Sequence, residues 1–385
     1  MYLLGIDFGT GGGKAVIINK RADVLGYGFE EYEIFTEKPG WSEHNASEYW
    51  NVACRVIKSA LSQSEIDPSG IKGIAVSSAL PSMVMVGKDG EPVARSYNLM
   101  DRRAVKQVEE VKEKIGEDRV FAISKNRLDD HPIIVNLLWE KENRPEIFSK
   151  IYKVLTIDGY IASKLTGEYT CHFSGAPFYG VAYNLEKETF DSDILKELNI
   201  PENIFPKLFA SENIIGSVFS SAAEESGLVP GIPVAAGQVD CNAGWVGAGA
   251  IGIGACQMNL GTAGNFGIVH DGSYFDPAMI NFAYTTKSNK EFVTVPTTTT
   301  GGQLIRYMRD NFYMAEKESE GKTGIDTYDI INEEAAIIPS GSEGLIMLPY
   351  LMGERTPIWD VHASAIQCWD SIQKNYGCAT CLTMI

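Results

Sequence analysis

The chain has 385 residues, of which 44% are hydrophobic and 22% charged, a composition typical of a globular protein with two or three domains. Its 33 Lys and Arg against 50 Asp and Glu give a net charge of -17, which argues against nucleic acid or an anionic membrane as a partner. No apolar run reaches transmembrane length, and the odd number of cysteines, 7, indicates reduced thiols in a cytoplasm.

Strands and helices alternate along most of the chain. The predicted strands are the apolar segments 2–7, 14–19, 24–29, 72–78, 82–87 and 153–158. The predicted helices are 44–63, 101–116, 132–143 and 159–167. A further apolar strand ends at Gly237, and a further helix follows the threonine and glycine run 297–302. This order predicts an α/β protein with helices packed on a sheet.

The stretch DFGTGGGK at 7–14 has the composition of a phosphate-binding turn. It is not a P-loop, because Phe8 stands where the first glycine should be and Ala15 follows the lysine. It is not a dinucleotide fingerprint either, because Lys14 takes the place of the third glycine. A strand follows, so the stretch is predicted to be a β-hairpin with Asp7 at its mouth. The turn can offer N–H groups to an anion and Asp7 can hold hydrated Mg²⁺, with an ordinary glycine-rich hairpin as the alternative.

A similar stretch, NLGTAGNFGI, recurs at 259–268. The offset is constant, so that Gly9 and Thr10 correspond to Gly261 and Thr262. Two such hairpins predict two similarly built domains that face each other, each with a phosphate-binding turn for one ligand. Coincidence in a chain with 38 Gly is the alternative.

Two further sites have residue types suited to catalysis or anion binding. Asp240 lies between the strand that ends at Gly237 and a segment rich in Gly and Ala, where it can act as a general base or, alternatively, cap a helix. Gly301 and Gly302 follow a run of threonines and precede a helix, which gives a helix N-terminus suited to anions.

Taken together, these segments resemble the FGGY carbohydrate kinases of the actin-like superfamily, and among them xylulokinases most. The resemblance runs from Met1 to about Ala363 and is carried, in order, by DFGTGGGK, GWSEH, MDRRA, LLWEKENRPEIF, DGYIASKLTGEY, PGIPVAAGQVDCNAGWVGAGA, NLGTAGN and LPYLMGERTPIWD. It implies an α/β, actin-like (ribonuclease H-like) two-domain sugar kinase fold. The sugar-binding domain would span 1–245, and an incomplete nucleotide-binding domain 246–363.

The resemblance implies ATP-dependent phosphorylation of a sugar hydroxyl, with conversion of D-xylulose to D-xylulose 5-phosphate as the first expectation. Asp240 matches the family's catalytic base, which would also touch the sugar, and Asp7 matches the carboxylate associated with Mg²⁺. The implied partner is a small-molecule sugar or polyol, and a homodimer is left open. The residues that the resemblance assigns to the nucleotide are Thr10, Gly11, Gly12, Gly261, Thr262, Gly301 and Gly302.

Two departures from the family pattern concern the sugar. Where xylulokinases usually have Gln-Met-His-Gly, this chain has ALPS at 79–82, so Leu80 and Pro81 replace a hydrogen-bonding side chain. The family's Trp-x-Asp-x-Arg keeps Asp101 and Arg103 but lacks the Trp. Because a pocket built to bind one hydroxyl discriminates strongly, a different substrate preference is expected. Another ketose, a polyol or an aldonate is therefore an alternative substrate.

The tail at 364–385 does not follow the family pattern, which continues with a glycine-rich stretch that clasps adenosine. A frameshift after about residue 363 is predicted, with a genuine short paralogue as the alternative. A catalytically inactive remnant that still binds sugar is therefore a second function class. An actin-like ATPase without a small substrate is a third, against which DRRA and GERTPIWD argue.

Overall fold

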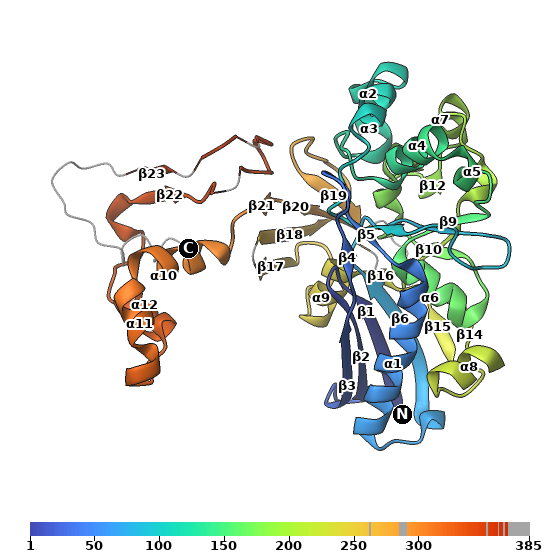
Figure 1. Ribbon diagram of the computed structural model, residues 1–385. Coiled ribbons are helices and arrows are strands. Elements are labelled where there is room, and N and C mark those ends of the chain that lie inside the picture. Colours follow the sequence, from blue (N-terminus) through green and yellow to red (C-terminus); the bar gives the residue numbers. More distant parts are fainter. Residues whose placement is uncertain (262, 285–290, 352, 361, 365, 369–385) are drawn as a thin grey trace. The chain divides into compact units, whose positions relative to one another are not determined.

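The computed structural model describes the chain except residues 262, 285–290, 352, 361, 365 and 369–385, so most of the predicted tail lies outside the described residues (Figure 1). The chain divides into two compact units. The first comprises Met1–Ala255, Val269–Pro277 and Asn281–Val293. The second comprises Cys256–Ile268, Ala278–Ile280 and Thr294–Ile385.

The first unit is built around a seven-stranded sheet with the order β14-β15-β6-β1-β2-β3, in which β16 also pairs with β6. Strands β1 to β3 form an antiparallel meander, whereas β6 runs parallel to β1, and β15 and β16 run parallel to β6. The strands are β1 (Tyr2–Phe8), β2 (Gly12–Asn19), β3 (Val24–Glu31), β6 (Ile71–Ser78), β14 (Ile214–Ser217), β15 (Pro233–Ala235) and β16 (Gln238–Val239).

Helix α1 (Ala46–Ser64) lies along β2 and β3 (Figure 1). It begins where the Asn45 side chain accepts a hydrogen bond from the Ser47 N–H, and its apolar face is buried in the first hydrophobic core. Gly26 lets the helix approach closely, because a Cβ there would lie 2.1 Å from the Ala60 carbonyl oxygen. Helices α6 (Ile157–Thr166) and α8 (Ser220–Ser226) contribute to the same core.

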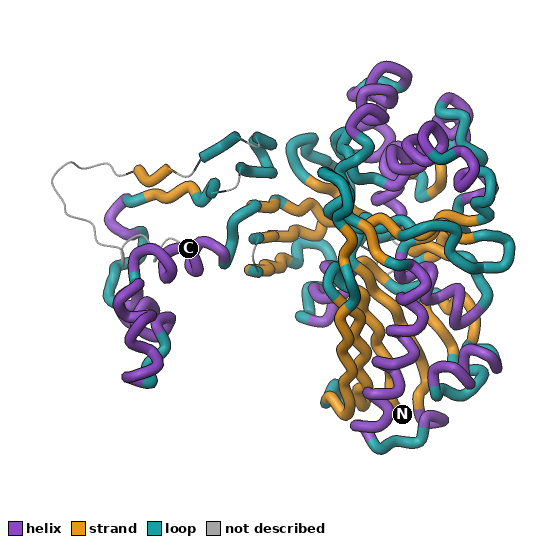
Figure 2. The backbone as a smooth tube through the Cα atoms, in the orientation of Figure 1, coloured by secondary structure: helices purple, strands orange, loops and turns teal. Residues whose placement is uncertain are grey.

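A second core of the first unit lies among helices and short strands (Figure 2). The helices are α2 (Val105–Lys114), α3 (Glu117–Ser124), α4 (Ile133–Asn143), α5 (Pro145–Phe148) and α7 (Ser192–Glu197). The short strands of this core are β7 (Val84–Val86), β8 (Ser96–Tyr97), β9 (Lys153–Leu155), β10 (Thr170–His172), β11 (Tyr183–Asn184), β12 (Thr189–Phe190) and β13 (Lys207–Phe209). Strands β4 (Ile34–Phe35) and β5 (Glu43–His44) form a three-stranded sheet with β8. Helix α9 (Asp240–Gly247) follows β16 directly.

The second unit contains an antiparallel hairpin and a group of helices. Strand β17 (Cys256–Leu260) pairs with β18 (Gly264–His270), and β18 also pairs with β21 (Thr297–Thr298). Strands β18, β19 (Ile280–Ala283) and β20 (Phe292–Val295) each contain residues of both units. The remaining elements are α10 (Gln303–Phe312), α11 (Met314–Thr323), α12 (Thr327–Ala336), β22 (Ile346–Leu348) and β23 (Ile366–Cys368).

Most predicted elements are present, with differences at their ends. The helix predicted from 101 begins only at Val105, because Asp101 and Arg103 form a buried ion pair ahead of it. The strand predicted at 153–158 ends at Leu155, because the Thr156 side chain caps α6. The strand predicted to end at Gly237 is two short strands, β15 and β16, with Gly237 between them.

The two predicted hairpins both form, but their pairing differs by one residue. In the first hairpin Phe8 is opposite Gly13, whereas in the second Leu260 is opposite Gly264. The second turn is therefore one residue shorter than the constant sequence offset suggests.

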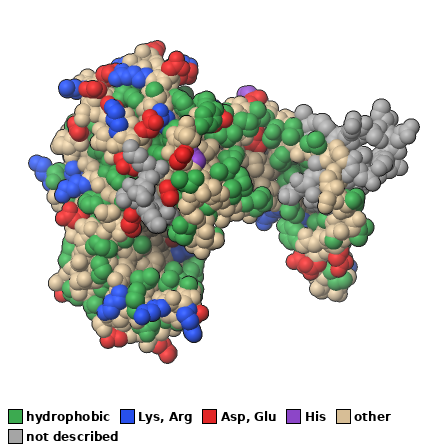
Figure 3. Space-filling model, turned by 180° about the vertical axis from the view of Figure 1, so that it is seen from behind, with side chains coloured by type: hydrophobic (Ala, Val, Ile, Leu, Met, Phe, Trp, Pro, Cys, Tyr) green, Lys and Arg blue, Asp and Glu red, His purple; other side chains and the backbone are tan. Residues whose placement is uncertain are grey.

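Charged side chains of both signs lie side by side on the molecular face shown in Figure 3, where Lys and Arg occur among Asp and Glu. Among the helices in the described ranges, none combines the length and the apolar character needed to cross a membrane.

Candidate active site

The parallel strands β1, β6 and β16 end at one edge of the sheet. Their register places Asp7 opposite Ser77, and Ser77 opposite Gln238, two residues before Asp240. Ligands of open α/β sheets bind outside the carboxyl ends of such strands. The two carboxylates predicted for chemistry, Asp7 and Asp240, are thus brought to the same edge.

Asp7 is held at this edge by two side chains. The Ser77 hydroxyl donates a hydrogen bond of 2.8 Å to Asp7 Oδ1, and Lys14 Nζ lies 3.4 Å from Asp7 Oδ2. About a third of the Asp7 side chain is exposed, and Lys14 is more exposed still. Such a loose, solvated ion pair leaves the carboxylate available to a hydrated divalent cation.

The turn that carries Thr10, Gly11 and Gly12 is supported from behind by aromatic side chains. The Tyr32 hydroxyl donates to the Gly9 carbonyl, and the rings of Phe8 and Tyr32 stack with centroids 6.2 Å apart. A Cβ at Gly12 would lie 2.6 Å from the Glu30 carbonyl oxygen, whereas one at Gly11 would meet no atom within 4 Å. Gly12 therefore packs on β3, and Gly11 is the turn residue open to a ligand.

Two titratable groups behind the turn are kept uncharged. Burial raises the pKa of the Tyr32 hydroxyl well above its usual range, and the negative charge of Asp7 raises it further. Burial lowers the pKa of His44 to about 4, against the raising effect of a backbone hydrogen bond with Thr10. Neither side chain adds charge to the turn at neutral pH.

Asp240 is the first residue of α9, and Val239 occupies the N-cap position. The alternative in which Asp240 caps the helix is therefore not supported. Its Oδ1 instead accepts the adjacent Cys241 N–H at 2.6 Å. Gly237 makes the preceding bend, because its φ is +91° and a Cβ there would lie 2.1 Å from the Val76 carbonyl oxygen.

The surroundings of Asp240 favour a proton acceptor that works near neutral pH. Burial raises its pKa to about 6. The negative charges of Asp7 and Asp158 raise it as well, whereas the Cys241 N–H and Lys14 lower it. A carboxyl group with this pKa is ionised at pH 7 and is still basic enough to take a proton from an attacking hydroxyl.

The predicted sugar residues Asp101 and Arg103 are paired with each other. Arg103 Nε and Nη2 donate to the Asp101 carboxylate at 2.6–3.0 Å, and the Ser42 N–H donates to Asp101 Oδ2 at 2.8 Å. The guanidinium also lies 3.7 Å from the centre of the Trp41 ring, and both charged side chains are almost fully buried. Among the described residues the buried Arg103 Nη1 has no hydrogen-bond partner, and the contact of Asp101 and Arg103 with sugar stays a prediction.

Leu80 and Pro81 follow the end of β6 and are both buried. Their side chains carry no hydrogen-bonding group, as expected from the sequence. The flanking serines bond instead to the start of α6, where Ser78 donates to the Asp158 carboxylate and Ser82 Oγ accepts the Ile157 N–H at 3.1 Å.

In the second unit, the predicted nucleotide residues lie close together. The Gly302 N–H donates to the Gly261 carbonyl at 2.7 Å. A Cβ at Gly301 would lie 2.5 Å from the Ala263 carbonyl carbon, so the N-terminus of α10 packs directly on the turn of the second hairpin. The Glu354 carboxylate accepts from Thr298 Oγ1 and the Thr299 N–H and so fixes the loop before α10. Thr262 lies outside the described residues, and the prediction that both hairpins face one ligand stays a prediction.

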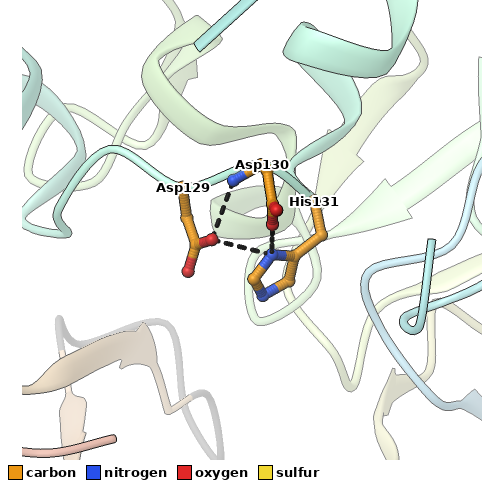
Figure 4. Close-up of side chains that lie close together, drawn as sticks. All are labelled: Asp129, Asp130 and His131. Atoms are coloured by element: carbon orange, nitrogen blue, oxygen red, sulfur yellow. Dashed lines mark hydrogen bonds and ion pairs between the residues drawn. The ribbon is translucent and has the colours of Figure 1, made fainter. Parts of the chain in front are cut away.

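Sequence reasoning did not single out a cluster formed by Asp129, Asp130 and His131 (Figure 4). His131 Nδ1 lies 3.0 Å from Asp129 and 2.9 Å from Asp130, and Arg102 contacts Asp130. Burial lowers the pKa of His131, but the bonds to the two carboxylates outweigh it and raise the pKa overall. The Arg102 guanidinium and the His131 ring thus contact the two carboxylates.

Three other residues near Asp7 and Asp240 were also missed. Lys14, Asp158 and Ser77 influence the two carboxylates by charge or hydrogen bonds. Lys14 and Asp158 had local signals, namely their places in the first hairpin and in the segment DGYIASKLTGEY. A separate cavity of about 500 Å³ is lined by residues 36–42 and Met100, and it contains none of the predicted site residues.

Comparison with known proteins identifies the family. The N-terminal domain of the FGGY family of carbohydrate kinases matches residues 2–247 of this chain. The chain is 32% identical to a xylulose kinase of Lactococcus lactis over 365 residues, which cover 93% of this chain and 69% of that protein. A gluconokinase of Bacillus subtilis is 28% identical, with coverage of 93% and 69%, and a glycerol kinase of Thermococcus gammatolerans is 27% identical, with coverage of 95% and 72%.

Solved structures agree on the fold. A xylulose kinase from Rhodospirillum rubrum has a TM-score of 0.87 at 22% identity, and the match covers 100% of this chain and 75% of the R. rubrum chain. A ligand-bound xylulose kinase from Lactobacillus acidophilus has a TM-score of 0.86 at 23% identity, with the same coverage. The chain belongs to the FGGY family of carbohydrate kinases, and the predicted α/β sugar kinase fold is confirmed.

Proposed function

We propose that this chain transfers the terminal phosphoryl group of ATP to a hydroxyl of a sugar, with D-xylulose as the first candidate. The observation that carries the proposal is the partly buried Asp240 carboxyl group, whose pKa is raised to about 6 and which lies at the strand edge that also holds Asp7. The similarity to a xylulose kinase supports the choice of sugar.

The reaction needs one proton acceptor and a site for the phosphate charge. The sugar oxygen forms a bond to the γ-phosphorus while the bond from that phosphorus to the β–γ bridging oxygen breaks, and ADP leaves. Asp240 accepts the proton of the attacking hydroxyl. Thr10 and the open Gly11 offer turn N–H groups to the phosphates, and Gly12 shapes this turn. Asp7 and its solvated pair with Lys14 suit Mg²⁺, which supplies charge neutralisation when bound.

In the second unit, we propose that Gly261, Thr262, Gly301 and Gly302 contact the nucleotide. The packing of α10 on the second hairpin supports this assignment. We also propose the domain limits 1–245 and 246–363, with Asp240 in the sugar-binding domain.

The substrate is the least constrained part of the proposal. Two relatives with sequence identity similar to that of the xylulose kinases are named glycerol kinase and gluconokinase. In addition, Leu80 and Pro81 give the site no hydrogen-bonding side chains. A panel of D-xylulose, L-xylulose, glycerol and gluconate should therefore be tested by coupled ADP release. Turnover with one of them would identify the substrate class. Sugar binding by calorimetry without ADP release would favour the second candidate, a protein that binds sugar without turnover.

A further inference from the structure

A buried chain of hydrogen bonds leads from the end of β6 to the backbone at the start of α9. Ser78 donates to Asp158 Oδ1, and Asp158 Oδ2 lies 2.9 Å from His172 Nε2. His172 Nδ1 lies 2.9 Å from Ser174 Oγ, which in turn accepts the Val239 N–H at 3.2 Å.

The direction of these hydrogen bonds follows from one backbone donor. The Gly175 N–H donates to His172 Nδ1 at 2.8 Å, so Nδ1 is an acceptor and the proton is on Nε2. The imidazole therefore donates to Asp158, and the Ser174 hydroxyl donates to the imidazole. Since Ser174 uses its proton in this way, its oxygen is free to accept the Val239 N–H. At most 1% of Asp158, His172 and Ser174 is exposed.

This series of hydrogen bonds ends next to Asp240, whose own side chain is weakly fixed. Among the described residues, the Asp240 carboxylate accepts a hydrogen bond only from the adjacent Cys241 N–H. Its direction is therefore set mainly by the backbone of Val239 and Asp240. The Ser174 hydroxyl is the side-chain group that bonds this backbone from another part of the fold.

We propose that Ser174, oriented by His172 and Asp158, is a positioning residue for phosphoryl transfer, because it fixes the backbone that aims the Asp240 carboxylate at the attacking hydroxyl. This inference rests on the proposed role of Asp240 as the base. Productive geometry is demanding, and a displacement of a fraction of an ångström costs on the order of tenfold in rate.

A double-mutant cycle tests the proposal on the full chain. Ser174→Ala should lower kcat about tenfold and leave the KM for sugar and for ATP within about twofold. In an Asp240→Asn background the same substitution should have no further effect, because the residue through which it acts is gone. Ser226→Ala is the matched control, since Ser226 is equally buried and its hydroxyl bonds the Ala222 carbonyl within α8.

Amide hydrogen exchange gives a readout that needs no turnover. Ser174→Ala should speed exchange in the peptide that contains Val239 and Cys241, and Ser226→Ala should not. Equal loss of rate on Ser174→Ala in both backgrounds, or unchanged exchange at Val239, would overturn the positioning role. A normal rate for Asp240→Asn alone would instead overturn the proposed base, so the two failures are distinguishable.

Discussion

Ser77 lies opposite Asp7 in the parallel register of β6 and β1, and its hydroxyl donates a hydrogen bond of 2.8 Å to the Asp7 carboxylate. The next residue, Ser78, donates to Asp158. Because successive side chains of a strand point to opposite faces, two adjacent serines reach two different carboxylates. The end of β6 thus binds Asp7 directly through Ser77. Through Ser78 and the buried series of hydrogen bonds it is also connected to the backbone next to Asp240.

Removal of the proposed base should abolish most of the turnover. Asp240→Asn keeps the size of the side chain but cannot accept the proton, so kcat should fall by about 10²–10⁴-fold while sugar affinity changes little. Steady-state kinetics and calorimetry measure the two effects. Asp191→Asn is a matched control, since asparagine can also cap α7. Near-normal turnover of Asp240→Asn would rule out the assignment.

The pH profile should report the environment of Asp240. With a pKa of about 6, the base is protonated in acid, so kcat should decline as the pH falls below about 6. Lys14 lowers this pKa, and Lys14→Gln should therefore move the acid limb to higher pH. Lys20→Gln, outside this group of charges, should leave the limb in place. A limb that does not move, or that moves to lower pH, contradicts the proposed link between Lys14 and Asp240.

The Asp240 carboxyl group should also reduce the free energy of unfolding at neutral pH. Its folded pKa is raised above the ordinary value of 3.8, so the folded state binds the proton more tightly and stability falls as the pH rises from about 4 to about 6. Asp240→Asn removes this loss and should raise the free energy of unfolding by about 1–3 kcal/mol at pH 7. Below pH 4 the gain should vanish. Denaturant titrations at both pH values test this, and an equal gain at both would contradict it.

The buried pair of Asp101 and Arg103 should matter first for stability. Arg103→Met leaves the Asp101 charge buried without its partner and should cost about 3–5 kcal/mol. Arg95→Met breaks a more exposed pair with Glu37, which lies 2.7 Å away, and should cost less than about 1 kcal/mol. Thermal unfolding measures both. A normally stable Arg103→Met variant with a sharply raised KM for sugar would instead favour the direct sugar contact expected from the sequence.

The sequence predicted the parts of this protein that local patterns determine. Alternating apolar residues in β1 and helical spacing in α1 were sufficient to predict both elements, and the glycine turn after Asp7 predicted the first hairpin. The bend at Gly237 was missed, because a short apolar segment does not show whether it forms one strand or two successive strands, here β15 and β16. The shorter second turn was missed because register depends on pairing, which a sequence offset does not determine.

The candidate site was predictable in its carboxylates but not in their partners. Asp7 and Asp240 lie in recognisable segments, whereas Asp158 and His172 are brought together only by the packing of α6 on β10. The burial of Arg103 beside Asp101 and Trp41 is a tertiary property that the sequence did not show, and its contact with sugar stays a prediction. Isolated polar residues in a sequence do not indicate whether they will bind a ligand or each other.

The most direct test of the proposed sugar kinase activity is a phosphorus NMR experiment on the full chain with ATP, Mg²⁺ and D-xylulose. We predict that a sugar phosphomonoester signal appears as ADP forms in equal amount, that neither forms when sugar is omitted, and that both form at least about 10²-fold more slowly when Asp240 is replaced by Asn. If no phosphomonoester appears with any sugar, polyol or aldonate of the panel, or if ADP forms equally without them, this chain does not carry out the proposed reaction.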